Sequence, residues 1–281
     1  MNDFEQKKRV IFLDIDGTLT PPGSNVPPES AVKAIAEARQ RGNYVFLCTG
    51  RNREMLRPLL QYEFDGVAAS SGGYIFCGQE ILYDHPMTHR MRDRVLQVLR
   101  EQGAFCTVEC KDGSYIESGL REYLRKNPDR GRNREMLLWR AEVEETLHIQ
   151  PMSRYLDQPV YKIVGMTDDR EILVRAKALL GENFYFCITD PNEFGFYSGE
   201  VMGKEFDKGT AIGKVCDYLG IPRAQSVAFG DSMNDLEMLQ AAGVGICMGN
   251  GSLKLKELAD QVCPAVAEDG LLRAFRKNGL C

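Results

Sequence analysis

The chain has 281 residues, of which 43% are hydrophobic and 27% are charged. This composition is ordinary for a globular protein of one large or two average domains, and it excludes a disordered or fibrous protein. The formal net charge of −5 argues against a dedicated nucleic-acid-binding protein, because phosphate contacts require a basic face. No apolar run approaches the ~20 residues that span a bilayer, and the N-terminus has no apolar signal core. We therefore expect a cytoplasmic protein without nucleic-acid or membrane partners.

The N-terminal segment, up to about residue 84, predicts the alternating strands and helices of a parallel sheet. A helix is expected to open at Pro28-Glu29 and to stop at Gly42, and a second is expected from Arg51 to Tyr62, kinked at Pro58. The predicted strands are residues 9–15, 44–50 and 66–72. Each is apolar throughout, as expected when helices cover both faces of a sheet.

The middle of the chain, from about His85 to Pro191, has a different pattern of mixed polar and apolar residues. Apolar stripes at helical spacing predict helices around residues 91–99 and 172–180. Four runs read as strands with one solvent-exposed face, which suits a small antiparallel sheet: residues 104–110, 159–165, 183–188 and 193–198.

The C-terminal segment returns to the first pattern, with a helical stripe over residues 212–219. Further buried strands are predicted at residues 226–231, 243–249 and 261–266. We therefore predict an α/β fold in which residues 1–84 and 191–281 form one parallel-sheet core. Residues 85–190 would form an inserted α+β domain.

The motif DIDGTLT at residues 14–20 is the strongest chemical signal, because it directly follows a predicted strand. Ligands of open parallel sheets bind beyond the carboxyl ends of the strands. Gly17 permits a tight turn there, so Asp14 and Asp16 are expected to face one cavity. Two close carboxylates repel each other unless a cation or a proton lies between them, and Mg²⁺ takes oxygen ligands of this kind.

A second acidic motif, GDSMND at residues 230–235, also follows a predicted strand. It supplies Asp231 and Asp235, with Asn234 between them. If both halves of the core share one sheet, these carboxylates converge on Asp14. Two acidic turns that cap helices by chance are the alternative, but grouped carboxylates without a cation would destabilise the fold.

Two weaker features complete a predicted phosphate site. In CTGR at residues 48–51, the hydroxyl of Thr49 and the following backbone amides, beginning at Gly50, could hold phosphate oxygens. Arg51 would support this loop. Lys208, at a predicted helix start, could neutralise a transferring phosphoryl group as a point charge.

Together these motifs resemble the haloacid dehalogenase-like (HAD) superfamily, and specifically its Cof-like phosphatases, which carry a large α/β cap after the third core strand. The resemblance covers essentially the whole chain. Its motifs are DIDGTLT (14–20), CTGR (48–51), DKGTAI (207–212), GDSMNDLEML (230–239) and EDGL (268–271). It implies a Rossmann-like core, Mg²⁺ as cofactor, and phosphoryl transfer through an aspartyl phosphate.

The resemblance also implies a role for each motif residue. Asp14 would be the nucleophile and a Mg²⁺ ligand. Asp16 would be the general acid and then the base, and its backbone carbonyl would ligate Mg²⁺. Asp231 would be the remaining carboxylate on the metal. The phosphoryl oxygens would be bound by Thr49 and Lys208, with Asp235 orienting Lys208 and Asn234 assisting at the phosphate or metal.

We therefore predict a Mg²⁺-dependent phosphatase that acts on a small phosphorylated metabolite of the sugar-phosphate type, as a monomer or small homo-oligomer. A phosphomutase or phosphotransferase is a second interpretation that the motif residues do not separate from the first. A receiver-like phospho-acceptor module is a third, which the second aspartate at Asp16 and the insertion disfavour.

Three features are left open by this prediction. Ser70-Ser71-Gly72-Gly73 stands where family members commonly have Asn-Gly. Basic residues outnumber acidic ones between Arg121 and Arg140, which is typical of a solvated helix face but would also suit a surface that attracts anions. Nine cysteines occur without a C-x-x-C pair, so buried free thiols are favoured over a zinc site built with His85 and His89.

Overall fold

The computed structural model describes residues 8–126, 145, 149–189, 191–192 and 195–281. The chain divides into two compact units. The core unit comprises Met1–Arg51, Leu56–Asp84 and Phe206–Cys281, and the inserted unit comprises Asn52–Met55 and His85–Glu205. Among the described residues, no helix has the length and apolar character required to cross a bilayer.

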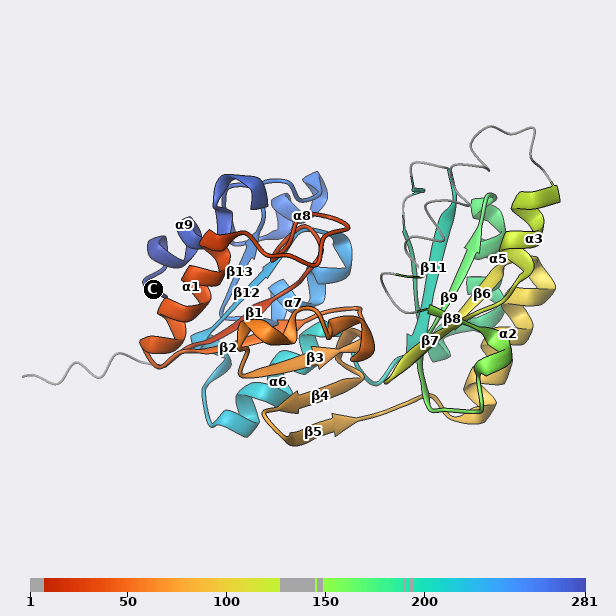
Figure 1. Ribbon diagram of the computed structural model, residues 1–281, viewed down its shortest axis with the longest axis horizontal. Coiled ribbons are helices and arrows are strands. Elements are labelled where there is room, and N and C mark those ends of the chain that lie inside the picture. The colour runs from red at the N-terminus through yellow and green to blue at the C-terminus, as the bar shows by residue number, and fades with distance from the viewer. Residues whose placement is uncertain (1–7, 127–144, 146–148, 190, 193–194) are drawn as a thin grey trace, which may run out of the picture. The chain divides into compact units, whose positions relative to one another are not determined.

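The core unit is built on an eight-stranded sheet in the order β14-β13-β12-β1-β2-β3-β4-β5 (Figure 1). Its strands are β1 (Val10–Leu13), β2 (Tyr44–Cys48), β3 (Gly66–Ala69), β4 (Tyr74–Cys77), β5 (Glu80–Asp84), β12 (Ser226–Gly230), β13 (Val244–Cys247) and β14 (Gln261–Val262). β4 and β5 pair antiparallel, whereas the other six strands are parallel. β1 lies at the centre, between β2 and β12.

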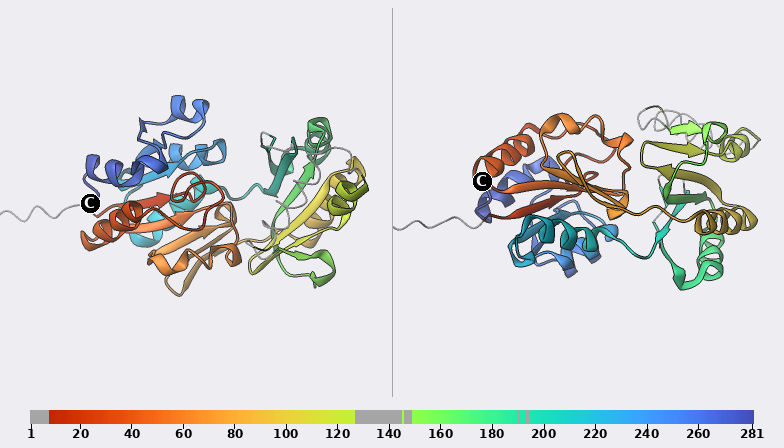
Figure 2. Two further views of the ribbon diagram at one scale, coloured as in Figure 1. Left: turned by 45° about the horizontal axis from the view of Figure 1, so that its top comes forward. Right: turned by 90° about the horizontal axis from the view of Figure 1, so that it is seen from below.

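Helices cover both faces of this sheet, which explains why its strands are apolar throughout. The helices are α1 (Glu29–Gln40), α6 (Lys208–Leu219), α7 (Leu236–Ala241), α8 (Leu253–Leu258) and α9 (Gly270–Lys277). α6, α7 and α8 pack on the face that carries Phe12 and Phe46. α1 and α9 pack together on the opposite face (Figure 2). The rings of Phe229 and Phe275 lie 5.3 Å apart there.

The inserted unit contains a six-stranded sheet in the order β10-β11-β9-β6-β7-β8. Its strands are β6 (Phe105–Cys110), β7 (Gly113–Ile116), β8 (Ile149–Pro151), β9 (Val160–Thr167), β10 (Phe184–Ile188) and β11 (Tyr197–Gly203). All neighbouring pairs are antiparallel except β7 and β8. The helices among its described residues include α2 (His89–Gln102), α3 (Gly119–Lys126) and α5 (Arg170–Leu180).

A buried ion cluster lies on one face of this second sheet. Lys162 on β9 contacts Glu109 on β6 at 3.3 Å and Glu200 on β11 at 3.2 Å. On the other face, Gly165 approaches Leu99 of α2 so closely that a Cβ atom there would lie 2.9 Å from it. The helix α2 therefore packs directly on the sheet backbone at that point.

These observations confirm the predicted α/β class, with a largely parallel core sheet and an inserted α+β unit. The helix predicted from Arg51 to Tyr62 is wrong, because only two short 3₁₀ turns form there, Glu54–Leu56 and Leu60–Tyr62. Pro58 lies between them and has no N–H for a helix hydrogen bond. The buried amide of Asn52 also hydrogen-bonds to Ser114 at 2.8 Å, which draws residues 52–55 into the inserted unit.

The strand and boundary predictions need three further corrections. The predicted boundary at residue 190 differs from the observed division, because β11 pairs with β9 and β10 and keeps residues up to Glu205 in the inserted unit. The strand predicted at 261–266 is only Gln261–Val262, since Pro264 cannot donate to a ladder. The antiparallel hairpin of β4 and β5 was not predicted.

Candidate active site

The parallel register brings the strand-end motifs of the core unit to one edge of the sheet. Val10 of β1 pairs with Tyr44 of β2 and with Ser226 of β12, so the three strands end side by side. Asp14 directly follows β1, and its N–H donates to the carbonyl of Phe229 on β12 at 3.0 Å. Residues that are far apart in the sequence thus meet at this edge.

Lys208 lies between two of the predicted carboxylates. Its Nζ donates to Asp14 Oδ1 at 2.7 Å and to Asp235 Oδ1 at 2.6 Å, and all three side chains are buried. Lys208 is the first residue of α6, whose start is fixed by reciprocal hydrogen bonds between Asp207 and Thr210. The helix start therefore determines where the ammonium group lies.

Asp235 also organises the second acidic loop. Its Oδ2 accepts the backbone N–H groups of Asp231 at 3.0 Å and of Ser232 at 3.1 Å. The amide oxygen of Asn234 accepts the hydroxyl of Ser232 in the same loop. Asp235 therefore connects Lys208 to the loop that carries Asp231.

Asp14, Asp231 and Asp235 form an acidic cluster, in which one oxygen from each residue lies within 4.8 Å of the other two. Burial and the neighbouring Asp235 raise the pKa of Asp14 to about 8, although Lys208 opposes this. Burial and Asp235 also raise the pKa of Asp231 to about 7. One ammonium group thus faces three carboxylates, so the donor set fits a hard divalent cation.

The structure separates the side chain of Asp16 from this cluster. Arg51 Nε and Nη2 donate to the two oxygens of Asp16 at 2.9 and 2.6 Å, and Arg51 Nη1 donates to Asn25. Thr49 is buried, and its hydroxyl accepts the backbone N–H of Arg51 at 3.1 Å across Gly50. The β2 loop is thereby tied to the DIDGTLT loop through Arg51 and Asp16.

Gly17 makes the close approach of the two acidic loops possible. Its φ is +81°, and a Cβ atom at this position would lie 2.4 Å from Asp231 Oδ2. The sequence indicated a tight turn at Gly17. The close contact with Asp231 is a second reason why only glycine fits at this position. Thr18 was not predicted as a site residue, yet its hydroxyl lies 3.5 Å from Asp231 Oδ1.

Comparison with known proteins agrees with this geometry. The profile of the haloacid dehalogenase-like hydrolase family matches residues 11–275, which is almost the whole chain. The chain belongs to this family. Together with the phosphatases among its relatives, the match also shows that the chain is a phosphatase enzyme, as the sequence predicted.

Several relatives of this haloacid dehalogenase-like hydrolase match it over nearly the whole of both chains. YkrA of Bacillus subtilis is 27% identical over 97% of this chain and 98% of its own length. The 5-amino-6-(5-phospho-D-ribitylamino)uracil phosphatase YcsE of Bacillus subtilis is 26% identical over 95% of this chain and 94% of its own. The solved structure of the HAD subclass IIB sugar phosphatase BT4131 superposes with a TM-score of 0.80 at 22% identity, covering 98% and 100% of the two chains.

The departure from the family pattern at Ser70 and Ser71 lies beside the β2 loop. The Ser71 N–H donates to the Thr49 carbonyl at 2.8 Å, and the Ser70 N–H donates to the Arg51 carbonyl at 2.9 Å. Both serines have positive φ angles, +50° and +56°, which L-residues rarely adopt. The Ser70 hydroxyl is buried without a hydrogen-bond partner in the described structure. The backbone N–H groups of this pair therefore connect it to the β2 loop.

We expect Ser71→Gly to stabilise the protein by about 0.5–1 kcal/mol, because glycine removes the left-handed strain at the cost of some unfolded-state entropy. Urea unfolding of the two proteins measures this difference. Ser71→Ala is the matched control, since it removes the hydroxyl and retains the strain. Equal unfolding midpoints for Ser71→Gly and Ser71→Ala would contradict the strain at this position.

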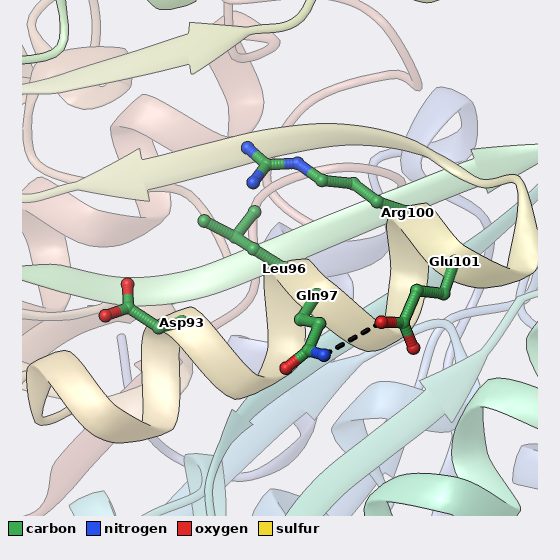
Figure 3. A pocket seen from close by; sticks show the side chains of 5 residues that line it. All are labelled: Asp93, Leu96, Gln97, Arg100 and Glu101. Carbon is green, nitrogen blue, oxygen red and sulfur yellow. Dashed lines mark hydrogen bonds between the residues drawn. The ribbon is translucent and has the colours of Figure 1, made fainter.

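Other candidate features belong to the inserted unit. A surface pocket of about 420 Å³ is lined by described residues of α2, and its polar groups include Gln97 and Glu101, which hydrogen-bond to each other (Figure 3). His85, His89, Cys106 and Cys110 form no group of three or more converging metal ligands among the described residues. All nine cysteines are free thiols, as expected. Of the basic stretch, Arg130, Arg132, Arg134 and Arg140 lie outside the described residues.

Proposed function

We propose that this enzyme hydrolyses phosphate monoesters of small metabolites with Mg²⁺, and that Asp14 is the nucleophile. The observation that carries this proposal is the buried contact between Asp14 and Lys208 inside a group of three carboxylates. A buried lysine can be balanced by two carboxylates, as Lys162 is by Glu109 and Glu200. The third carboxylate of this cluster, Asp231, suits a centre that binds a divalent cation and a phosphoryl group.

In the first step, a carboxylate oxygen of Asp14 attacks phosphorus, and the bond between phosphorus and the substrate alcohol breaks. Asp16 gives its proton to the departing alkoxide, which leaves as the alcohol. In the second step, Asp16 accepts a proton from water, whose oxygen attacks the phosphorus of the aspartyl phosphate. Inorganic phosphate leaves, and Asp14 returns to its free carboxylate.

Positively charged and polar groups of the chain would hold the transferring group during both steps. The Lys208 ammonium, already 2.7 Å from Asp14, would also contact a phosphoryl oxygen, as would the Thr49 hydroxyl, the Gly50 N–H and Asn234. A Mg²⁺ ion held by Asp14, Asp231 and the Asp16 carbonyl would neutralise charge on the phosphoryl oxygens. Arg51 donates to both oxygens of Asp16, so this ion pair must open before Asp16 can carry the proton that it gives to the alkoxide.

The substrate class is supported by the names of relatives. YcsE is named for a phosphorylated ribityl compound, and BT4131 is named a sugar phosphatase. Each name describes a phosphate ester on a small polyhydroxylated or sugar-like molecule. A sugar-phosphate-type metabolite is therefore the substrate that we propose for this chain.

We expect the purified protein to release inorganic phosphate from p-nitrophenyl phosphate and from sugar phosphates with Mg²⁺, and to stop when EDTA is added. Colorimetric phosphate assays across a panel of esters measure this and rank the substrates. Excess Mg²⁺ added back after EDTA should restore the rate. Undiminished turnover in EDTA would contradict a metal-dependent mechanism.

We also expect the Mg²⁺ affinity of the metal-free protein to rise with pH. Because burial raises the pKa values of Asp14 and Asp231 to about 8 and about 7, protons compete with the cation below that range. From about pH 6 to about pH 8.5, the dissociation constant should fall by roughly tenfold or more. Calorimetric titration with MgCl₂ measures it, and Asp231→Asn should weaken the pH dependence. An affinity that is constant over this range would contradict the raised pKa values of Asp14 and Asp231.

A further inference from the structure

The loop between β13 and α8, residues 249–252, contacts both acidic loops of the core unit. The N–H of Ser252 donates to the carbonyl of Asp231 at 2.8 Å. The side-chain Nδ2 of Asn250 donates to the carbonyl of Gly17 at 2.7 Å. One short loop therefore joins the backbone that follows Asp14 and Asp16 to the backbone of Asp231.

Asn250 is also tied to the C-terminal part of the chain. Its Oδ1 accepts the N–H of Val266 at 2.9 Å. Val266 begins the short turn that leads into the EDGL motif at residues 268–271, a motif for which the catalytic steps give no role. The side-chain amide of Asn250 thus donates to the Gly17 loop and accepts from the Val266 turn. It makes both bonds although Asn250 is exposed.

Close packing keeps this loop in place. A Cβ atom at Gly251 would lie 2.7 Å from the Asp231 carbonyl oxygen and 2.7 Å from Cys247 Sγ, so the loop backbone lies directly against the second acidic loop. Gly17 is equally tight against the Asp231 carboxylate. Because Gly17 and Gly251 both approach Asp231 so closely, a small rotation of the Gly17 peptide would change how the DIDGTLT loop lies against Asp231.

The chemistry of the contact requires an amide. The Gly17 carbonyl needs a donor and the Val266 N–H needs an acceptor, and the asparagine side chain offers both. An aspartate has the same shape but, when ionised, would place an acceptor oxygen against the Gly17 carbonyl oxygen. It would also add negative charge near the acidic cluster.

We propose that Asn250 is a positioning residue that fixes the Gly17 peptide, and with it the approach of the DIDGTLT loop to Asp231, and that the turn Val266–Glu268 anchors Asn250 for this purpose. The inference rests on the proposed function for its catalytic consequence. Asn250 itself contacts backbone groups only in the described structure, and it takes no part in the chemical steps.

The test compares Asn250→Ala with Asn278→Ala. Asn278 has a matching pair of bonds, since its Nδ2 donates to the Ala274 carbonyl at 2.9 Å and its Oδ1 accepts Gln261 Nε2 at 3.1 Å, but none of its contacts is with the acidic loops. In the metal-free Asn250→Ala protein, we expect the backbone amides of residues 14–20 to exchange their hydrogens faster. Its dissociation constant for Mg²⁺ should rise, and its rate of p-nitrophenyl phosphate hydrolysis should fall, each by roughly 10–100-fold. Asn278→Ala should change none of these three quantities.

Asn250→Asp should be more damaging than Asn250→Ala by the same measurements. The inference is overturned if Asn250→Ala and Asn278→Ala behave alike in hydrogen exchange and Mg²⁺ calorimetry, or if Asn250→Asp matches the unmodified protein. Hydrogen exchange and calorimetry need no substrate. A protein without phosphatase activity, in which Asn250→Ala still loosens residues 14–20 and weakens Mg²⁺ binding, would overturn the proposed function and leave the positioning role standing.

Discussion

Asp14→Asn is expected to lower kcat for phosphate-ester hydrolysis by roughly 10⁴-fold or more, because the amide cannot attack phosphorus or form the covalent intermediate. The substitution is nearly isosteric, and it removes one of three carboxylates that cluster around a single ammonium. We therefore expect the fold to survive. Phosphate release measured at saturating Mg²⁺ and substrate gives the loss directly.

The control for this variant is its stability. Since burial and Asp235 disfavour the charged form of Asp14, Asp14→Asn should unfold at a urea concentration no lower than the unmodified metal-free protein. Rapid acid quench of the unmodified enzyme during turnover should trap phosphate on Asp14, and the variant should trap none. Retained turnover by a correctly folded Asp14→Asn protein would rule out the nucleophile assignment.

Lys208→Met should abolish activity and also destabilise the protein, by about 3–5 kcal/mol, because it leaves buried carboxylates without their counter-charge. Lys208 is 2% exposed and contacts both Asp14 and Asp235, so water cannot replace the ammonium. Urea unfolding of metal-free protein measures the loss of stability. Added Mg²⁺ should recover part of it, since the cation supplies positive charge to the same oxygens.

Lys162→Met is the matched control for the Lys208 prediction. Lys162 is also buried between two carboxylates, Glu109 and Glu200, but it belongs to the inserted unit. Lys162→Met should also destabilise the protein, whereas the variant should bind Mg²⁺ with unchanged affinity. An unfolding midpoint for Lys208→Met equal to that of the unmodified protein would show that this ammonium does not compensate the acidic cluster.

The sequence predicted the core strands and the convergence of the acidic motifs because both depend on local patterns. Uniformly apolar strands indicate a covered sheet, and the acidic residues directly follow those strands. Once β1 and β12 are neighbours in parallel register, Asp14 and Asp231 must lie at the same edge. Free thiols were predictable for the same reason, since most cysteines lie within apolar runs.

Contacts that depend on tertiary structure could not be predicted in this way. The pairing of Asp16 with Arg51, and the bridge made by Asn250, join loops whose mutual orientation is set by the whole sheet. The boundary near residue 205 depends on which sheet β11 joins, and its composition does not decide this. The helix expected after Arg51 is replaced by two 3₁₀ turns on either side of Pro58, and the contact of Asn52 with Ser114 could not be foreseen.

The placement of β1 between β2 and β12 has a consequence for biosynthesis. During translation, β1 is made first, yet one of its two ladder partners begins only at Ser226. Until that stretch leaves the ribosome, a fully apolar strand has an open edge, and contacts of such long sequence separation form slowly. That edge of β1 therefore stays unpaired until β12 has been made, and the centre that holds Asp14 and Asp231 is assembled late in synthesis.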